Sequence, residues 1–132
     1  MLTFFLGSAL FAQGGWKVRL GWNVILDASA EDTAKNVAIV DAGKLRALTL
    51  VYLERSIDPG WERFLAVYDE NDREVLQQKG KQLRITRARL SSLLKASPTL
   101  KFYTWALPSD PNEKARVKVR RLHLCTLRTK TP

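Results

Sequence analysis

Three basic residues near the C-terminus have the spacing of a linear binding surface. Arg116, Lys118 and Arg120 occupy alternate positions, so on an extended strand their side chains would share one face at intervals of about 7 Å. Such a row can follow the charges of an anionic polymer. It equally suits a solvated edge strand, where charge prevents pairing with other chains. We favour this second interpretation because no aromatic residue interleaves with the row to stack on bases.

The basic residues are concentrated in two stretches of a chain whose formal net charge is +9. Residues 73–95 contain seven basic residues and one acidic residue, and residues 114–132 contain seven basic residues and no acidic one. Residues 41–72 instead contain seven acidic residues and four basic ones. The molecule is therefore expected to have a basic side, where Arg87 and Arg89 join the C-terminal row as candidate contacts for an anionic partner.

The four tryptophans are the second group of candidate binding residues, since an exposed indole can stack on a sugar ring or a nucleobase. Trp16 and Trp22 share the apolar phase of an alternating segment and are expected in the core. Trp105 shares one face of a later strand with Tyr103. Trp61 follows a Pro-Gly turn, and it is the tryptophan that we expect to be exposed.

Acidic residues between positions 58 and 72 are the candidates for acid–base chemistry. Two carboxylates that face one cleft can form a glycosidase pair. The run from Asp69 to Asp72 also offers clustered oxygen atoms to Ca²⁺, but a plain hairpin turn is the favoured interpretation. The candidate carboxylates are Asp58, Glu62, Asp69, Glu70 and Asp72.

His123 and Cys125 are two positions apart on an expected strand, so we expect their side chains to point the same way. They could form half of a metal site or a Cys–His nucleophile pair, but a structural histidine beside an inert cysteine is favoured. One cysteine and one histidine in the whole chain exclude an intramolecular disulfide, a thiolate zinc site and a multi-histidine centre. We predict no metal and no cofactor, and an enzyme is disfavoured.

Most of these residues are carried by short segments with the two-residue alternation of β-strands. Residues 41–44 are expected to form a hairpin turn. The last strand is expected to contain a β-bulge at Arg120-Arg121, where its apolar phase slips by one residue. The expected strands are 16–26, 35–40, 45–53, 61–68, 73–78, 83–86, 100–107 and 115–127.

A change of period marks one helix between the strands. Leu90, Leu93 and Leu94 have helical spacing, and Thr86 and Pro98 provide the expected start and stop. The sequence predicts an amphipathic helix at about 87–96 and an antiparallel β-sandwich of seven or eight strands, with the helix bridging the two sheets. The absence of strand–helix alternation argues against a parallel sheet.

The length of 132 residues, with 45% hydrophobic and 27% charged residues, is that of one ordinary globular domain. Residues 2–12, LTFFLGSALFA, carry no charge and resemble the apolar region of a secretory signal with cleavage after Ala12. The segment is too short to span a bilayer. The alternative is a buried first strand or helix. We expect residues 1–12 to be the signal and residues 13–132 the domain.

The leading functional hypothesis is an exported, non-catalytic binding or accessory module of the cell envelope, located in the periplasm or secreted. Its basic face would meet an acidic envelope polymer, an anionic lipid surface or an acidic protein. An intracellular nucleic-acid-binding module is the alternative that the net charge supports. A small hydrolase that uses the acidic residues of 58–72 is the second alternative.

Overall fold

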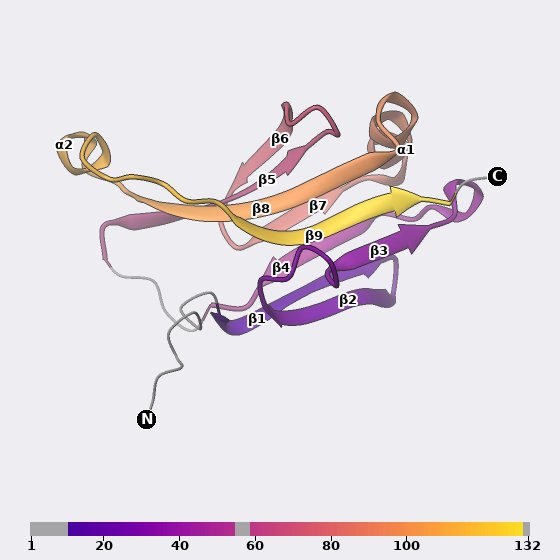
Figure 1. Ribbon diagram of the computed structural model, residues 1–132, viewed down its shortest axis with the longest axis horizontal. Helices are drawn as coiled ribbons and strands as arrows, with labels where there is room; N and C mark the ends of the chain where they lie inside the picture. Colours follow the sequence, from indigo (N-terminus) through magenta and orange to yellow (C-terminus); the bar gives the residue numbers. More distant parts are fainter. Residues whose placement is uncertain (1–10, 55–58, 131–132) are drawn as a thin grey trace.

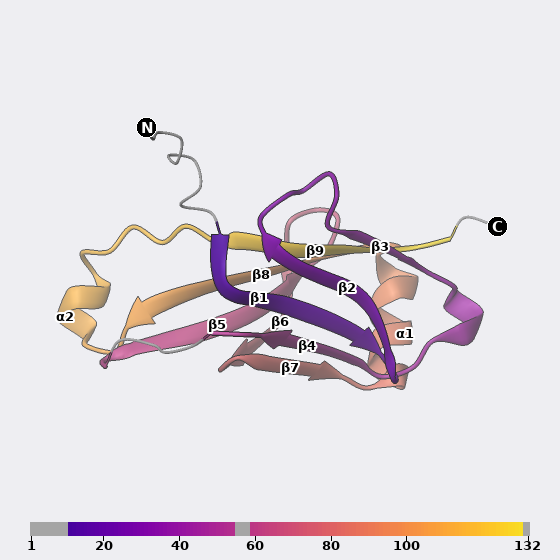
Figure 2. The same ribbon diagram turned by 90° about the horizontal axis from the view of Figure 1, so that it is seen from below.

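The structure is a computed structural model that describes residues 11–54 and 59–130. The expected signal segment lies outside the described residues, apart from Phe11 and Ala12. Within the described part, two β-sheets pack face to face, as Figures 1 and 2 show. The predicted β-sandwich is therefore confirmed.

The first sheet has four strands in the order β2-β1-β4-β7, and all its pairings are antiparallel. Its strands are β1 (Phe11–Leu20), β2 (Asn23–Ala30), β4 (Leu48–Tyr52) and β7 (Gln82–Ile85). The second sheet has five strands in the order β3-β9-β8-β5-β6, and its β3–β9 pairing is parallel. Its strands are β3 (Val37–Val40), β5 (Trp61–Tyr68), β6 (Glu74–Lys79), β8 (Thr99–Pro108) and β9 (Leu122–Thr129).

The core lies between the two sheets and is built by the alternation that the sequence displays. Inward positions of the first sheet carry fully buried side chains such as Trp16, Val18 and Leu50, whereas the intervening positions are polar or only partly buried. Leu65 and Phe102 are among the buried residues that oppose them from the second sheet. Burial of this apolar surface is the main force that holds the two sheets together.

Helix α1 (Arg87–Ala96) confirms the predicted helix. The Thr86 side chain accepts a hydrogen bond from the Arg89 amide, and Leu90 and Leu94 are buried. The helix carries the chain from β7 in the first sheet to β8 in the second, as expected. A short 3-10 helix, η3 (Ala42–Lys44), and a one-turn helix, α2 (Pro111–Lys114), were not predicted. Helices α1 and α2 lie at opposite ends of the sandwich (Figure 1).

The prediction of one strand over 16–26 is wrong, because the chain reverses at Gly21 and Trp22. Gly21 has a φ of 62°, and Leu20 pairs with Asn23 in the β1–β2 hairpin. The two-residue turn places Val24 opposite the outward Arg19, and a register shift then returns Leu26 to the side of Val18. The even-numbered apolar residues therefore continue through the turn without sharing one face, so the sequence pattern conceals the reversal. Trp22 consequently lies in the turn and is 97% exposed, not in the core as expected.

The hairpin expected at 41–44 is also wrong. Asp41 caps η3 by accepting a hydrogen bond from the Gly43 amide. The strand before this turn, β3, pairs in parallel with β9 and belongs to the second sheet, whereas β4 belongs to the first. The turn therefore moves the chain between layers instead of joining two neighbouring strands.

The β-bulge occurs on β9, but not at the expected position. Phe102 pairs with Cys125 and Tyr103 pairs with His123, so Leu124 is the extra residue. Leu124 and Cys125 are both fully buried in the core, whereas the ring of His123 packs edge-on against Tyr103 with centroids 5.6 Å apart. The expectation that His123 and Cys125 share a face is therefore wrong, because the bulge reverses the alternation between them.

Candidate anion-binding site

The C-terminal basic row does not form the expected strand face. Arg116, Lys118 and Arg120 lie between α2 and β9, in a stretch without strand structure among the described residues. Pairing of β9 with β8 begins only at Leu122, so the preceding segment has no partner strand to hold it extended. Arg120 is moreover paired with Glu31 at 2.7 Å. The prediction of a row on one strand face is wrong.

The other predicted binding residues lie apart from that segment. Arg87 and Arg89 are exposed in the first turn of α1. Arg87 lines a hollow of about 330 Å³ together with Arg46. Trp61, at the start of β5, is 37% exposed and lines a separate hollow of about 240 Å³ beside Arg63 and Lys79.

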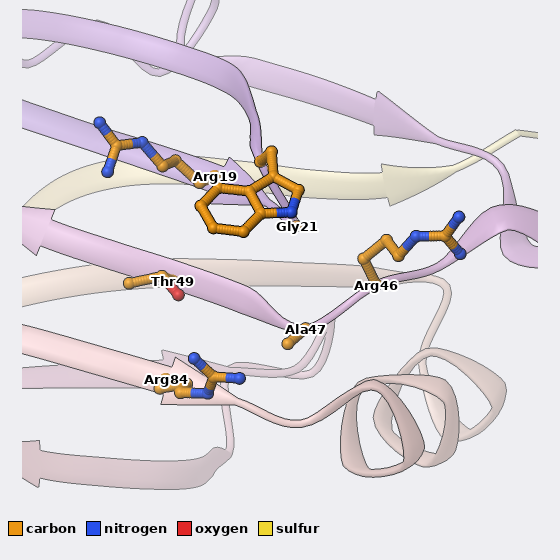
Figure 3. A pocket seen from close by; sticks show the side chains of 7 residues that line it. Arg19, Gly21, Arg46, Ala47, Thr49 and Arg84 are labelled. Carbon is orange, nitrogen blue, oxygen red and sulfur yellow. The ribbon is translucent and has the colours of Figure 1, made fainter.

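Three arginines that the sequence analysis did not single out line a hollow of about 450 Å³ on the outer face of the first sheet. Arg19 on β1 and Arg84 on β7 are both in register with Thr49 of the intervening strand β4. Arg46 precedes β4, and the exposed Trp22 also lines the hollow. Figure 3 shows that the three arginines come from separate segments and that the side chains of Arg19 and Arg46 point in opposite directions.

Local structure explains how these side chains are positioned. Arg19 and Arg84 occupy outward positions of strands whose neighbouring side chains, such as Val18 and Ile85, are buried. The Gly21 amide donates a 2.8 Å hydrogen bond to the Ala47 carbonyl, which fixes the β1–β2 turn against the segment that carries Arg46. A Cβ atom at position 21 would lie 3.1 Å from Cγ of Arg46, so glycine also leaves room for this arginine.

The three guanidinium groups have no acidic partner among the described residues. The salt bridges found there involve Arg63, Arg73, Lys79, Arg120 and Arg121. Of the three arginines, Arg46 makes a long 3.5 Å contact from Nη1 to its neighbouring carbonyl, that of Leu45. Because Arg19, Arg46 and Arg84 are all exposed, they keep their hydrogen-bond donors available for an external anion.

Two smaller hollows extend this site. One, of about 140 Å³, is lined by Lys17, Arg19, Val51 and Leu53. The other is the hollow shared by Arg46 and Arg87. Arg19 therefore lines both the first and the second hollow, and Arg46 lines both the first and the third. We call the set Lys17, Arg19, Arg46, Arg84 and Arg87 the cationic face.

Arg121, on the opposite side of the sandwich, differs from these arginines because its guanidinium group has partners within the chain. Its guanidinium lies 4.6 Å from the ring centroid of Tyr68 and 4.2 Å from that of Tyr103, and it pairs with Asp72 at 2.8 Å. Stacking on two rings and a carboxylate partner hold this arginine in place. The arginines of the cationic face have no comparable contacts within the described chain.

The acidic residues proposed for hydrolysis are engaged separately. Glu62 pairs with Lys79 at 2.7 Å, and Asp72 pairs with Arg121. Asp69 accepts hydrogen bonds from the amides of Arg73 and Asn71, and that from Arg73 contributes most to lowering the pKa of its carboxyl. Asp58 lies outside the described residues. Glu62, Asp69 and Asp72 therefore each have a basic partner of their own.

The surroundings of His123 and Cys125 favour a structural role for both side chains. Nε2 of His123 lies 2.8 Å from Oγ1 of Thr126, and burial lowers the pKa of the ring. Burial raises the pKa of the Cys125 thiol to about 12, which keeps it protonated at neutral pH. Among the described residues, no group of three His, Cys, Asp or Glu side chains lies close enough to hold a metal ion.

The cationic face could not be found from sequence spacing, because its members are joined by strand pairing across the chain. The available indication was the polar phase of Lys17 and Arg19 opposite buried neighbours. The sequence matches no model of a known protein family and no curated protein. The function is therefore inferred from the geometry of the cationic face.

Proposed function

We propose that the protein is a non-catalytic binding module that holds an anionic partner on the cationic face, at the cell envelope after export. The observation that carries the proposal is the hollow around Arg19, Arg46 and Arg84, which have no carboxylate within 4.0 Å in the described chain. Each arginine presents a planar fork of donors that matches the oxygens of a phosphate or carboxylate.

The arrangement favours a partner with several negative charges. An isolated exposed ion pair contributes little, since water and salt screen it. The five cations line three hollows that share Arg19 or Arg46, so they act together on a polyanion, and the binding releases its counterions. Affinity should consequently fall steeply with salt concentration.

Polyphosphate titration at several salt concentrations tests this proposal. The variant Arg19→Gln/Arg46→Gln/Arg84→Gln should bind far more weakly and show a shallower salt dependence. The matched control Arg116→Gln/Lys118→Gln/Arg128→Gln removes the same charge from exposed positions elsewhere, and it should retain most of the affinity. Equal loss in both variants would mean that net charge alone drives binding, and the cationic face would be rejected.

Export remains a proposal supported by the uncharged residues 2–12. Cleavage after Ala12 would leave intact the pairing of Trp16–Leu20 with β4. Expression of the full chain in a bacterial host, cell fractionation and mass spectrometry of the N-terminus test this point. A periplasmic chain that begins at Gln13 would support export, whereas a cytoplasmic chain that begins at Met1 would overturn it.

Nucleic-acid binding is the second candidate, because Trp22 lines the same hollow as the three arginines. A base stacked on the indole with its phosphates on the arginines would fit this chemistry. A single-stranded oligonucleotide that binds much more tightly than polyphosphate, with the difference lost in Trp22→Ala, would favour this candidate over an envelope partner.

None of the described helices is long and apolar enough to cross a membrane.

A further inference from the structure

Exposed apolar side chains lie among the cations of the first sheet's outer face. Trp22 is 97% exposed, Val24 47% and Leu53 39%. Val24 is directly opposite Arg19 in the β1–β2 register, and Leu53 lines a hollow with Lys17 and Arg19. Solitary exposed apolar residues are common on proteins, but here three large ones share a surface with the cationic face.

The positions of these residues give the surface a defined layout. Trp22 lies in the turn that follows Leu20, the residue paired with Leu48 at one end of β4. Leu53 follows Tyr52, which pairs with Trp16 at the other end of β4. Apolar side chains therefore stand near both ends of the face, and Arg19 and Arg84 lie between them. Figure 2 shows β1, β4 and β7 side by side as one layer of the sandwich.

A soluble polyanion and a lipid surface would make different contacts with these cationic and apolar side chains. A phosphate polymer would contact the cations but gain little from Val24 and Leu53. A bilayer with anionic headgroups would attract the cations and also receive the apolar side chains at its boundary with the acyl chains. Tryptophan in particular prefers that interface, because its ring is apolar and its N–H can remain hydrogen-bonded.

We infer that the cationic face docks on an anionic phospholipid bilayer, with the arginines at the headgroup phosphates and Trp22 inserted at the interface. The inference rests on the proposed function and deepens it by naming the partner. Charge complementarity selects an anionic surface, and the exposed apolar side chains select lipid over a soluble polymer. The cationic face extends across β1, β4 and β7, so it fits an extended membrane surface better than a single nucleic-acid strand.

Vesicle sedimentation provides the first test. The full chain should bind phosphatidylcholine vesicles that contain phosphatidylglycerol, and should not bind vesicles of phosphatidylcholine alone. Each charge removed from the cationic face should weaken binding about fivefold. Trp22→Ala should weaken vesicle binding about tenfold or more while polyphosphate binding changes little. Trp61→Ala, which removes an exposed tryptophan away from the face, should bind both as the parent chain does.

Fluorescence quenching provides the second test and does not depend on a loss of affinity. Lipids with bromine atoms in the upper acyl chain should quench the fluorescence of Trp22. The fluorescence of the other tryptophans, measured in Trp22→Phe, should be quenched little. Trp22 is almost fully exposed, so its replacement leaves the core intact.

The outcomes separate this inference from the proposed function. Binding to both polyphosphate and anionic vesicles, without an effect of Trp22→Ala and without quenching, would overturn insertion while the proposed function stands. Binding to polyphosphate without binding to vesicles would overturn the lipid surface alone. Binding to neither would overturn both.

Discussion

Nε1 of Trp16 on β1 donates a 2.8 Å hydrogen bond to the backbone carbonyl of Leu124 on β9, and it thereby joins the two sheets through the core. Leu124 is the bulged residue of β9, left without a partner on β8. The hydrogen bond gives the buried indole N–H a partner inside the core, where an unsatisfied polar group would be costly.

Replacement of this indole should destabilise the fold. Trp16→Phe removes the hydrogen bond to the Leu124 carbonyl and leaves a small cavity in the core, so we expect a loss of about 2–4 kcal/mol in the free energy of unfolding. Urea denaturation at neutral pH measures the change. Trp22→Phe, the matched control at a fully exposed indole, should change the free energy by less than about 0.5 kcal/mol. A similar effect of both substitutions would contradict the burial described for Trp16.

Gly21→Ala should affect both stability and binding. The substitution places a side chain at a φ of 62° and its Cβ within 3.1 Å of Arg46, so we expect a loss of about 1–2 kcal/mol from the backbone alone. Polyphosphate affinity should fall as Arg46 is displaced. Gly60→Ala is the control, because Gly60 has a φ of 84° but no atom within 4 Å of the added Cβ. Gly60→Ala should lower the free energy of unfolding by a similar amount. Its affinity for polyphosphate should be unchanged, and a loss of affinity in this variant would contradict the prediction.

The Glu54–Arg63 ion pair should contribute much more than the exposed pairs. Its closest atoms are 2.7 Å apart, and its side chains retain only 10% and 13% exposure. Glu54→Gln would leave the Arg63 charge buried without its carboxylate, so we expect a loss of about 3 kcal/mol. Glu62→Gln, which breaks the more exposed pair with Lys79, should cost less than about 1 kcal/mol. Chemical denaturation of both variants tests the ranking, which equal losses would refute.

Acid should weaken the fold in two stages. Burial lowers the pKa of His123 below its ordinary value of 6.5, despite the opposing effect of Glu31. Because the unfolded chain then binds the proton more readily, stability is full above pH 6.5 and declines as the pH falls below it. For Glu31, burial favours a raised pKa, but hydrogen bonds from the His123 amide and Arg120 outweigh burial and lower it. Stability from this carboxylate is full above its ordinary pKa of 4.5 and is lost as the pH falls further.

Thermal unfolding between pH 7 and about pH 3 measures both stages, because the Glu31 contribution is lost only below pH 4.5. The parent chain should show a falling midpoint throughout this range, and His123→Gln should lose the part of the decline nearest pH 6. A midpoint that rises on acidification would contradict the sign derived for both groups.

The sequence was most informative where structure is set by nearby residues. Leu90 and Leu94, the Thr86 cap and Pro98 define α1 within a dozen positions, and the helix has the expected bounds. The alternation at 16–20 likewise fixed which side chains are buried. Trp22 was misplaced because the even-numbered apolar residues continue unbroken through the turn, although the turn and the register shift beside it change the face on which they lie.

Features that depend on pairing between distant segments could not be read from the sequence. Alternation does not specify a neighbour, so the parallel contact of β3 with β9 was not foreseen. The same reason applies to the candidate site. Arg19 and Arg84 are far apart in the chain and meet only through their common partner Thr49. The basic row at 116–120 looked convincing because its spacing was local, but no neighbouring strand holds it extended.

The position of β9 in the second sheet has a consequence for folding. Residues 122–129 form the latest of the described strands in the sequence, yet they lie between β3 and β8. During synthesis, β3 and the adjoining edge of β8 must wait for this strand before they acquire their partner, and such long-range closure slows folding. The two strands have exposed pairing edges throughout that interval. A growing chain therefore remains open to capture by a chaperone until β9 emerges and completes the sheet.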